Sequence, residues 1–456
     1  MKRKMIIKKA VALVLTFTMA FSIAACGDSG QAEKAKEQGI EQQGTEEKEA
    51  EQGTGQETAK AGAEKTKISF WAPFSGGDGD IMTELVDEFN AQSSTTEVEF
   101  MIIKSEEFYT KLLAAMTTDT APTVAVNHIT RIKEYVNDGL IEPLDDLASA
   151  AGVDFGEFTE RLQASAAIDG NFYCMPMDTH LLLMHFNTDE FERMGLLEED
   201  GTVNVPRGEE AFFEYFHNVK SQLGNGQIPI SGTSMNGLPM YLWYTLLTQY
   251  GGDICDETGS TATLNSEENI KALSVIMRMV DEEIWPKNQK NGGELFTGKI
   301  APATINGVWA VPMFEGTDGL NFVSMPFPQF TDKDSVYADS HTLVIPKNKN
   351  TTEEEKVAAM EFMKWLTDNT AKWARAGHIP SKQSVIDSEE FRNLPYRSVY
   401  ADSAQYAKIF PQVCGIAGLT ELTYRELAAM IAGSQDVETT AENMQNGFQE
   451  ILDSYK

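Results

Sequence analysis

Several aromatic and polar side chains of this sequence stand where predicted strands end, and their chemistry suits contact with a small ligand. Trp71 lies at the end of a strand pattern at residues 67–72 and Ser75 follows it, and Asn127 and His128 follow another at residues 122–126. Indole faces stack on C–H groups, whereas hydroxyl, amide and imidazole groups form hydrogen bonds. Ligands of open α/β sheets bind at the carboxyl ends of the strands, so these positions predict part of a binding site.

Asp178 and Asp339 are the carboxylates that could carry out a reaction. Asp178, Thr179 and His180 lie within a long apolar segment at residues 173–186, and Asp339 precedes a strand pattern at residues 341–345. Two carboxylates about 5 to 10 Å apart could act as the acid and the nucleophile of a glycoside hydrolase. The sequence does not give their separation, so this enzyme class stays open as the alternative function.

Other kinds of chemistry have weaker signals. A GDSG string at residues 27–30 lies in a polar segment that cannot position a base, and neither a GxSxG elbow nor a phosphate-binding loop is present. The six histidines are scattered, so we expect neither a metal site nor a cofactor. Besides Cys26, the cysteines are Cys174, Cys255 and Cys414, without CxxC spacing. We expect buried free thiols, and one disulfide among the three stays open.

The elements that would position these residues alternate between strand and helix. The strand at residues 67–72 precedes a helix with Ile81, Leu85 and Phe89 on one face. A second strand at residues 98–102 precedes a helix from Ser105, and the third, at residues 122–126, precedes a helix that Gly139 can end. Three strand–helix units in a row predict an α/β fold with a largely parallel sheet covered on both faces.

A second region has the same alternation. The apolar segment at residues 173–186 is followed by predicted helices at residues 209–223, around Tyr241 and Trp243, and from Ile270 to Ile284. Strand patterns return at residues 300–305, 320–325 and 341–345. Thr352 and Glu355 have the spacing of a capping box at the head of a helix through Leu366.

The N-terminal residues indicate export. Lys2, Arg3 and Lys4 begin a cationic segment, and residues 11–20 are apolar but too few to span a bilayer, which is typical of a signal peptide. Ala24, Ala25 and Cys26 resemble the lipobox of bacterial lipoproteins, which implies cleavage before Cys26 and lipidation of its sulfur. Residues 26–65 are polar and almost free of aliphatic side chains, so we expect a disordered tether.

The net charge and length of the chain limit the classes of partner and the fold that we expect. The chain of 456 residues carries a formal net charge of -32, so a nucleic-acid partner is excluded and the acidity serves solubility. The roughly 390 residues beyond the tether are too many for one core and suit two α/β lobes. No long apolar run follows residue 20, so the expected membrane attachment is the lipid alone.

Many weak motifs together resemble one family. FWAPFSGG, PTVAVNH, YCMPMDTHLLLMHFN, GKIAPATINGVW, SHTLVIPKNKN and GHIPSKQSV are similar, in order and spacing, to segments of the extracellular solute-binding proteins of ABC importers. The branch that includes maltose-binding protein is the most similar. The resemblance implies two discontinuous α/β lobes joined by a hinge. The first would hold residues 66–177 and 338–378, and the second residues 178–337 and 379–456, after a signal peptide at residues 1–25.

The resemblance also implies a sugar or oligosaccharide ligand between the lobes, a permease as partner, a monomeric state and no catalysis. Sugars need aromatic rings for their C–H faces and short polar groups for their hydroxyls. The residues of this chain expected to supply them are Trp71, Ser75, Asn127, Asp178, His180, Tyr241, Trp243, Asn306, Trp309, Asp339 and His378. Core packing is the alternative role for the tryptophans, and hydrogen bonding at the hinge is the alternative for the aspartates.

Overall fold

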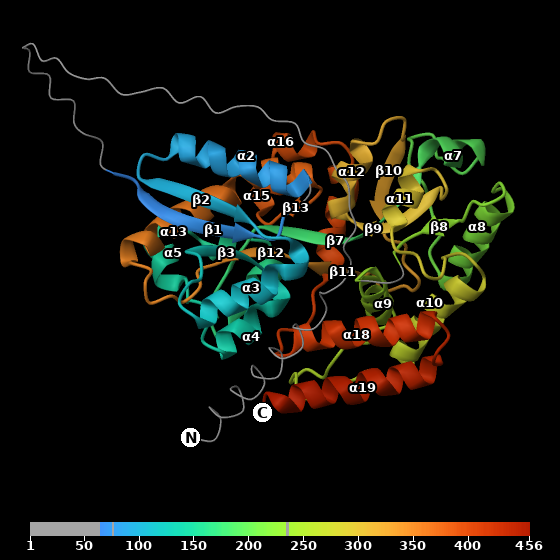
Figure 1. The fold of residues 1–456 in the computed structure, drawn as a ribbon. Helices are drawn as coiled ribbons and strands as arrows, with labels where there is room; N and C mark the ends of the chain where they lie inside the picture. Colours follow the sequence, from blue (N-terminus) through green and yellow to red (C-terminus); the bar gives the residue numbers. More distant parts are fainter. Residues whose placement is uncertain (1–63, 75–76, 234–236) are drawn as a thin grey trace, which may run out of the picture. The chain divides into compact units, whose positions relative to one another are not determined.

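The computed structural model of the chain describes residues 64–74, 77–233 and 237–456. This part of the chain contains two large sheets and a two-stranded one, with helices packed around them (Figure 1). The predicted α/β class with two sheet-containing lobes is confirmed. The signal peptide, Cys26, almost all of the tether and Ser75 lie outside the described residues.

The first lobe is built around a five-stranded sheet in the order β2-β1-β3-β12-β6. Its strands are β1 (Thr66–Ala72), β2 (Thr96–Ile102), β3 (Val124–His128), β6 (Met175–Pro176) and β12 (His341–Val344). β1 pairs in parallel with β2 and β3, and β12 is antiparallel to β3 and β6. The parallel pairs are those that strand–helix alternation requires.

Alternation along β1 explains how helices cover both faces of this sheet. Ile68 and Phe70 join one apolar core with α2 and α13, whereas Trp71 packs on the opposite side against the core that includes α3. The helices of this region are α2 (Gly77–Gln92), α3 (Ser105–Thr117), α4 (Ile132–Asn137), α5 (Asp145–Ala151), α6 (Glu160–Ala166), α13 (Glu353–Asp368) and α14 (Thr370–Trp373). Successive strand residues face opposite ways, so one strand anchors two helical layers.

The second lobe is built around a seven-stranded sheet in which β7 is central. β11, β9, β10 and β13 all pair with β7. The strands are β7 (Asp178–Asn187), β8 (Ile230–Ser231), β9 (Ala303–Gly307), β10 (Phe322–Pro326), β11 (Val336–Asp339), β13 (Ile379–Pro380) and β14 (Ala407–Lys408). Every residue of β7 is buried, as expected for a strand covered on both faces, and its buried polar side chains include Asp178 and His180.

The other elements follow the same chain order. The remaining helices are α7 (Thr188–Arg193), α8 (Glu209–Ser221), α9 (Leu238–Gln249), α10 (Glu267–Asp281), α11 (Gly292–Thr297), α12 (Val311–Glu315), α15 (Gln383–Ile386), α16 (Glu389–Arg392), α17 (Arg397–Ala401), α18 (Ile416–Ile431) and α19 (Val437–Ser454). The 3-10 segments are η1 (Ile129–Arg131), η2 (Phe155–Glu157), η3 (Val308–Ala310), η4 (Ala374–Ala376) and η5 (Asp402–Tyr406), and β4 (Ala167–Ile168) pairs with β5 (Asn171–Phe172).

The chain passes between the two sheets at three places. β6 of the first sheet leads into β7 of the second, β11 leads back into β12, and the segment before β13 returns again (Figure 1). Only Met177 separates β6 from β7, and only Ser340 separates β11 from β12. Residues at these crossings therefore lie close to both lobes.

Most predicted elements are confirmed. The capping box at Thr352 and Glu355 is present at the head of α13, with both reciprocal hydrogen bonds formed. The third strand begins and ends two residues later than expected, so Asn127 and His128 lie inside β3 and not after it. Cys174, Cys255 and Cys414 are free thiols, and burial raises the pKa of Cys174 to about 12.

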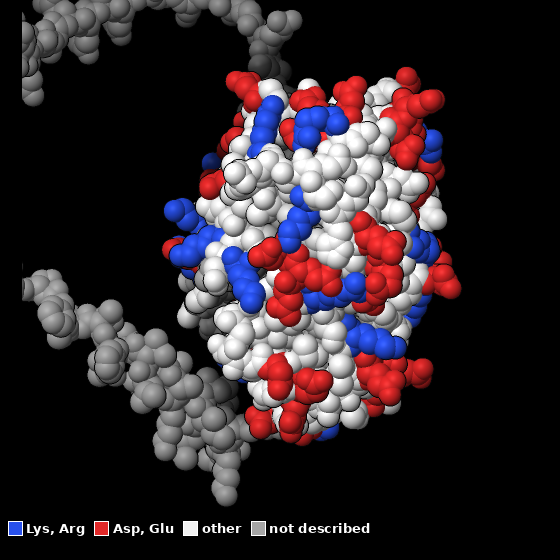
Figure 2. Space-filling model, turned by 90° about the vertical axis from the view of Figure 1, so that its right-hand side faces the viewer, with Lys and Arg blue, Asp and Glu red and all other residues white. Residues whose placement is uncertain are grey.

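Many of the acidic side chains lie on the protein surface. On the face that includes α8, Asp and Glu side chains are spread between Lys and Arg (Figure 2). Arg278 of α10 pairs there with Glu210 of α8 at 2.6 Å and with Glu282 at 2.8 Å. These pairs are partly or fully exposed, so each contributes little to stability.

Candidate ligand-binding site

A cavity of about 880 Å3 lies between the two lobes. The first lobe contributes residues of α3, β3 and η1, and the second contributes residues of α9, β9, η3, β11 and α18. The lining residues are Ser105, Tyr109, Thr110, His128, Thr130, Arg131, Thr233, Gly237, Leu238, Met240, Tyr241, Asn306, Trp309, Tyr337, Asp339, Phe410, Ile416, Ala417, Thr420, Glu421 and Tyr424.

Three aromatic rings form one wall of this cavity. Tyr241 stacks on Tyr337 with ring centroids 4.4 Å apart and an angle of 13° between the planes. Trp309 meets Tyr241 edge to face at 5.8 Å, and it is 36% exposed. The wall, defined as Tyr241, Trp309 and Tyr337, thus offers an accessible indole supported by two packed phenol rings.

A glycine permits the position of the Trp309 ring. A Cβ atom on Gly307 would lie 2.1 Å from the indole, far closer than any real contact. The backbone φ of Gly307 is -93°, so the conformation itself does not require glycine. Close approach of the ring to the backbone is therefore the reason for glycine in the NGVW segment.

Polar groups face the cavity from both lobes. Asp339 accepts a hydrogen bond from the Thr130 hydroxyl at 2.8 Å and another from the backbone N–H of Ser340 at 2.8 Å. Burial raises the pKa of Asp339, although His180 opposes the shift. Arg131 lies over the ring of Tyr109 at 3.9 Å, and Glu421 lies on α18. Hydroxyl groups of a ligand would find both acceptors and donors here.

Four residues predicted from sequence line the cavity, namely Tyr241, Asn306, Trp309 and Asp339. Asn306 accepts a hydrogen bond from the backbone N–H of Gly307 at 2.9 Å, which fixes its amide at the end of β9. These four come from four different elements, namely α9, β9, η3 and β11. Ser75 is the one predicted ligand contact outside the described part of the chain.

Trp243 lies in the core and not at the cavity. Its side chain is fully buried, and its indole N–H donates to Asn269 of α10 at 2.6 Å. Residues two apart on a helix point about 200° away from one another. Since Tyr241 faces the cavity, Trp243 must face the opposite side of α9, where α10 packs.

Trp71 and Asn127 also lie away from the cavity lining. Trp71 is half-buried and packs against apolar side chains beside the sheet. The amide of Asn127 is fully buried in β3 without a hydrogen-bond partner. The residue after it, His128, lines the cavity instead and is hydrogen-bonded to the Tyr109 hydroxyl.

Several lining residues have no local signal in the sequence. Tyr109 lies on a helix whose other apolar residues serve the core, and Tyr424 lies on α18, far along the chain. Tyr337 precedes Asp339 by two residues on β11, so the two side chains share one face of that strand. That period is the one signal by which Tyr337 could have been found.

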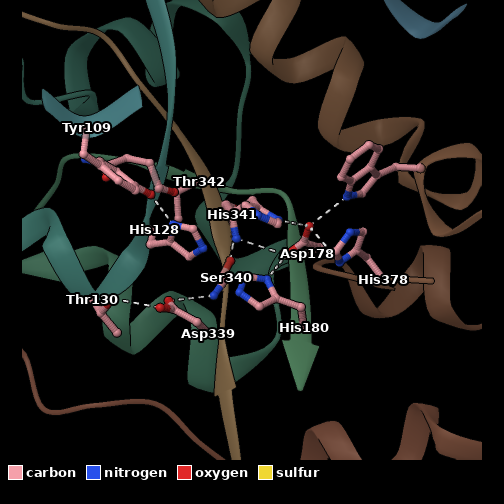
Figure 3. Close-up of polar contacts among 12 residues, drawn as sticks. Tyr109, His128, Thr130, Asp178, His180, Asp339, Ser340, His341, Thr342 and His378 are labelled. Carbon is pink, nitrogen blue, oxygen red and sulfur yellow. Dashed lines mark hydrogen bonds and ion pairs between the residues drawn. The ribbon is translucent and has the colours of Figure 1, made fainter. Parts of the chain in front are cut away.

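A cluster of histidine and aspartate side chains lies beside the cavity. We define the hinge cluster as Asp178, His180, His341 and His378, which are buried at the interlobe crossings (Figure 3). The carboxylate of Asp178 accepts from His341 Nδ1 at 2.8 Å and from His180 Nδ1 at 3.1 Å. Asp178, His180 and His378 were predicted as ligand contacts, but they face one another here.

Burial and charge set the protonation of this cluster. Burial disfavours charge on Asp178, yet the neighbouring histidines more than offset it and hold the carboxyl pKa well below its usual value. Burial likewise opposes the charge of His341, but Asp178 raises the pKa of that imidazole. Burial lowers the pKa of His378 to about 3, so its ring is neutral at physiological pH.

The geometry does not favour the hydrolase alternative. Both Asp178 and Asp339 are buried, with 0% and 4% of their surface exposed. Both oxygens of Asp178 already accept hydrogen bonds, from Trp373 Nε1 at 2.7 Å and from the backbone N–H of His341 at 3.0 Å as well as from the two histidines. A catalytic carboxylate would have to reach a glycosidic oxygen, and Asp178 has no free oxygen with which to do so.

A comparison with known families identifies the architecture. The sequence matches the profile of bacterial extracellular solute-binding proteins over residues 84–397. The chain belongs to this family. The resemblance derived from the motifs is thereby confirmed at the level of the family, and so is the prediction of a binding protein over an enzyme.

Relatives and solved structures agree with the assignment of this solute-binding protein. The lactose-binding protein of Rhizobium radiobacter is 23% identical over 252 residues, which are 53% of this chain and 56% of the relative. The GacH receptor of Streptomyces glaucescens, solved unliganded and with acarbose, has a TM-score of 0.75 at 18% identity, covering 86% of this chain and 100% of that one. UgpB from Mycobacterium tuberculosis, in complex with glycerophosphocholine, has a TM-score of 0.76 at 21% identity, covering 86% and 99%.

The family also bears on where the solute-binding protein works. Extracellular solute-binding proteins act outside the cytoplasm, in agreement with the predicted export. Among the described residues, no helix combines the length and apolar character that crossing a bilayer demands.

Proposed function

We propose that this protein captures a sugar or oligosaccharide between its lobes and delivers it to the permease of an ABC importer. The observation that carries the proposal is the aromatic wall of the interlobe cavity, where the half-exposed Trp309 and polar groups of the other lobe line the same space. An accessible indole together with hydrogen-bond donors and acceptors matches the C–H faces and hydroxyl edges of a sugar ring.

The charge of the lining supports a neutral ligand. Among the described lining residues, Arg131 is the cationic one, and Asp339 and Glu421 are the acidic ones. Arg131 is already engaged over the ring of Tyr109. Binding of acarbose by the GacH receptor and of lactose by the Rhizobium relative supports the same ligand class. The glycerophosphocholine of UgpB defines the competing class, a phosphodiester.

Closure of the lobes around the ligand is part of the proposal. Strands of the first sheet come from residues 66–176 and 341–344, and strands of the second come from residues 178–339, 379–380 and 407–408. This distribution supports lobes of residues 66–177 with 338–378 and of 178–337 with 379–456. The three short crossings between them would act as the hinge.

The remaining parts of the proposal rest on the sequence. A lipid on Cys26 would hold the monomeric protein at the outer face of the cell membrane, with residues 26–65 as its tether. An acylated anchor of two or more chains suffices for stable attachment. Metabolic labelling with palmitate, lost in a Cys26→Ala variant, tests this part separately.

Calorimetry and thermal unfolding of the purified chain test which class of ligand the protein binds. The panel consists of maltooligosaccharides, lactose and glycerophosphocholine. We expect a sugar to stabilise the protein by about 2.7 kcal/mol at 100 times its dissociation constant, without turnover on chromatography. Hydrolysis of the sugar, or binding of the phosphodiester alone, would overturn the proposal.

A further inference from the structure

The hinge cluster joins all three crossings between the lobes. Asp178 and His180 belong to the start of β7, His341 begins β12, and His378 directly precedes β13. Four of the six histidines of the chain lie here or next to the cluster, since His128 is within 4.9 Å of His341 between ring centroids. Figure 3 shows His180, His341 and His378 directed toward the Asp178 carboxylate.

The spacing of the cluster suits one small cation. Asp178, His180, His341 and His378 each offer a ligand atom, and these atoms all lie within 4.8 Å of one another. From Asp178, the nitrogens of His341, His180 and His378 lie at 2.8, 3.1 and 3.7 Å. Ligand atoms around a tetrahedral zinc ion are separated by about 3.3 Å, because the bonds measure about 2.0 to 2.1 Å. Small side-chain rotations therefore suffice to surround an ion.

His378 supplies an independent sign of a missing partner. Its side chain is 1% exposed, and neither ring nitrogen has a hydrogen-bond partner. The ring stacks on Trp373 with centroids 4.9 Å apart and 6° between planes, which fixes its direction. A buried polar atom without a partner is costly, and coordination of a cation by the free nitrogen would remove that cost.

The surroundings of Asp178 resemble the outer shell of a metal site. Trp373 Nε1 and the backbone N–H of His341 donate to its two oxygens at 2.7 and 3.0 Å. Such donors orient a ligating carboxylate, and an ion would take the lone pairs to which His180 and His341 now donate. The second group at this place, His128, His180 and Asp339, is less suitable, because it offers three ligand atoms whereas a structural zinc site uses four.

We propose that Asp178, His180, His341 and His378 bind one divalent transition-metal ion of the zinc class, which links the three crossings of the hinge. Three imidazole nitrogens and one carboxylate oxygen are ligands that Zn2+ prefers, whereas Mg2+ and Ca2+ prefer oxygen alone. No local sequence pattern indicated the site, since its ligands lie in three separate segments of the chain. The inference is independent of the proposed sugar ligand.

Titration of the full chain with Zn2+ and Co2+ tests the site. After treatment with a chelator and in the absence of sugar, we expect one Zn2+ per chain by calorimetry. Bound Co2+ should show the intense visible bands of four-coordinate cobalt. Zn2+ affinity should fall at least about 100-fold in His341→Gln and in His378→Gln, whereas His217→Gln on the surface leaves it unchanged.

Two results would overturn the metal site. One is the absence of saturable Zn2+ binding to the correctly folded protein. The other is unchanged Zn2+ affinity in both cluster variants. If either variant fails to fold, X-ray absorption of the zinc-loaded wild-type chain decides, since three imidazoles and one carboxylate support the site and a shell of oxygens alone refutes it. Sugar binding measured in the presence of chelator keeps a failure here distinct from failure of the proposed function.

Discussion

The cavity and the hinge cluster lie side by side, yet they differ in how far their side chains are exposed to solvent. Trp309 is 36% exposed at the cavity, whereas Asp178 is fully buried with both oxygens hydrogen-bonded. Asp339 belongs to the cavity lining and His341, two residues later, belongs to the cluster. The same short crossing thus contributes one residue to an open cavity and another to a buried cluster. Changes in the cluster should affect folding, and changes in the wall should affect binding.

The largest effect is expected from Asp178→Asn. The amide NH2 cannot accept the hydrogen bonds that Trp373 and His341 donate, and the buried histidines lose their counter-charge. The free energy of unfolding should fall by about 3 to 5 kcal/mol in urea titrations with chelator present. Asp332→Asn, at an exposed position, should stay within about 0.5 kcal/mol of the wild type. Equal stability of both variants would remove the distinction between cluster and surface.

Trp309→Ala should show the reverse behaviour. The half-exposed indole contributes little to the core, but it is the accessible face of the aromatic wall. Sugar affinity should fall about 30-fold, equivalent to about 2 kcal/mol, with unfolding almost unchanged. Trp243→Phe, buried against α10, should lower stability and leave the affinity of the folded protein intact. Loss of affinity in the Trp243 variant alone would place the ligand elsewhere.

His185, a buried histidine outside the cluster, should make the stability of the protein depend on pH. Burial lowers the pKa of His185 from its ordinary 6.5 to about 3, and its neighbours are the Ser324 hydroxyl at 2.8 Å and the Phe314 ring. Between these two pKa values the unfolded chain holds one more proton than the folded chain. Stability from this residue is therefore complete above pH 6.5 and is lost as the pH falls toward 3.

Replacement of His185 tests that sign. In His185→Gln, the free energy of unfolding should depend less steeply on pH between 6 and 4, by up to about 1.4 kcal/mol per pH unit. Urea titrations at several pH values give the two slopes. An identical slope in the variant would show that His185 takes up its proton in the folded protein.

Features that depend on local periodicity could be predicted from the sequence, whereas the hinge cluster could not. Strand and helix order followed from local periodicity, and so did the capping box of α13. Tyr241 and Trp243 looked equivalent on one aromatic helix, although helical geometry allows only one of them to face the cavity. The hinge cluster needed segments around residues 178, 340 and 378 to meet, and no local pattern encodes that meeting.

The smallest predicted effect concerns Gly307, whose lack of a side chain leaves room for the Trp309 ring. Its φ of -93° suits alanine, so Gly307→Ala adds only a methyl group, at 2.1 Å from the Trp309 ring. The indole must turn away to relieve this contact, and sugar affinity should fall about 10-fold, since overpacking of this kind costs about 1 to 3 kcal/mol. Gly316→Ala, where the nearest atom is 3.4 Å away, is the matched control. Unchanged affinity in Gly307→Ala, with the ring shifted in a crystal structure, would mean that the indole face does not touch the sugar.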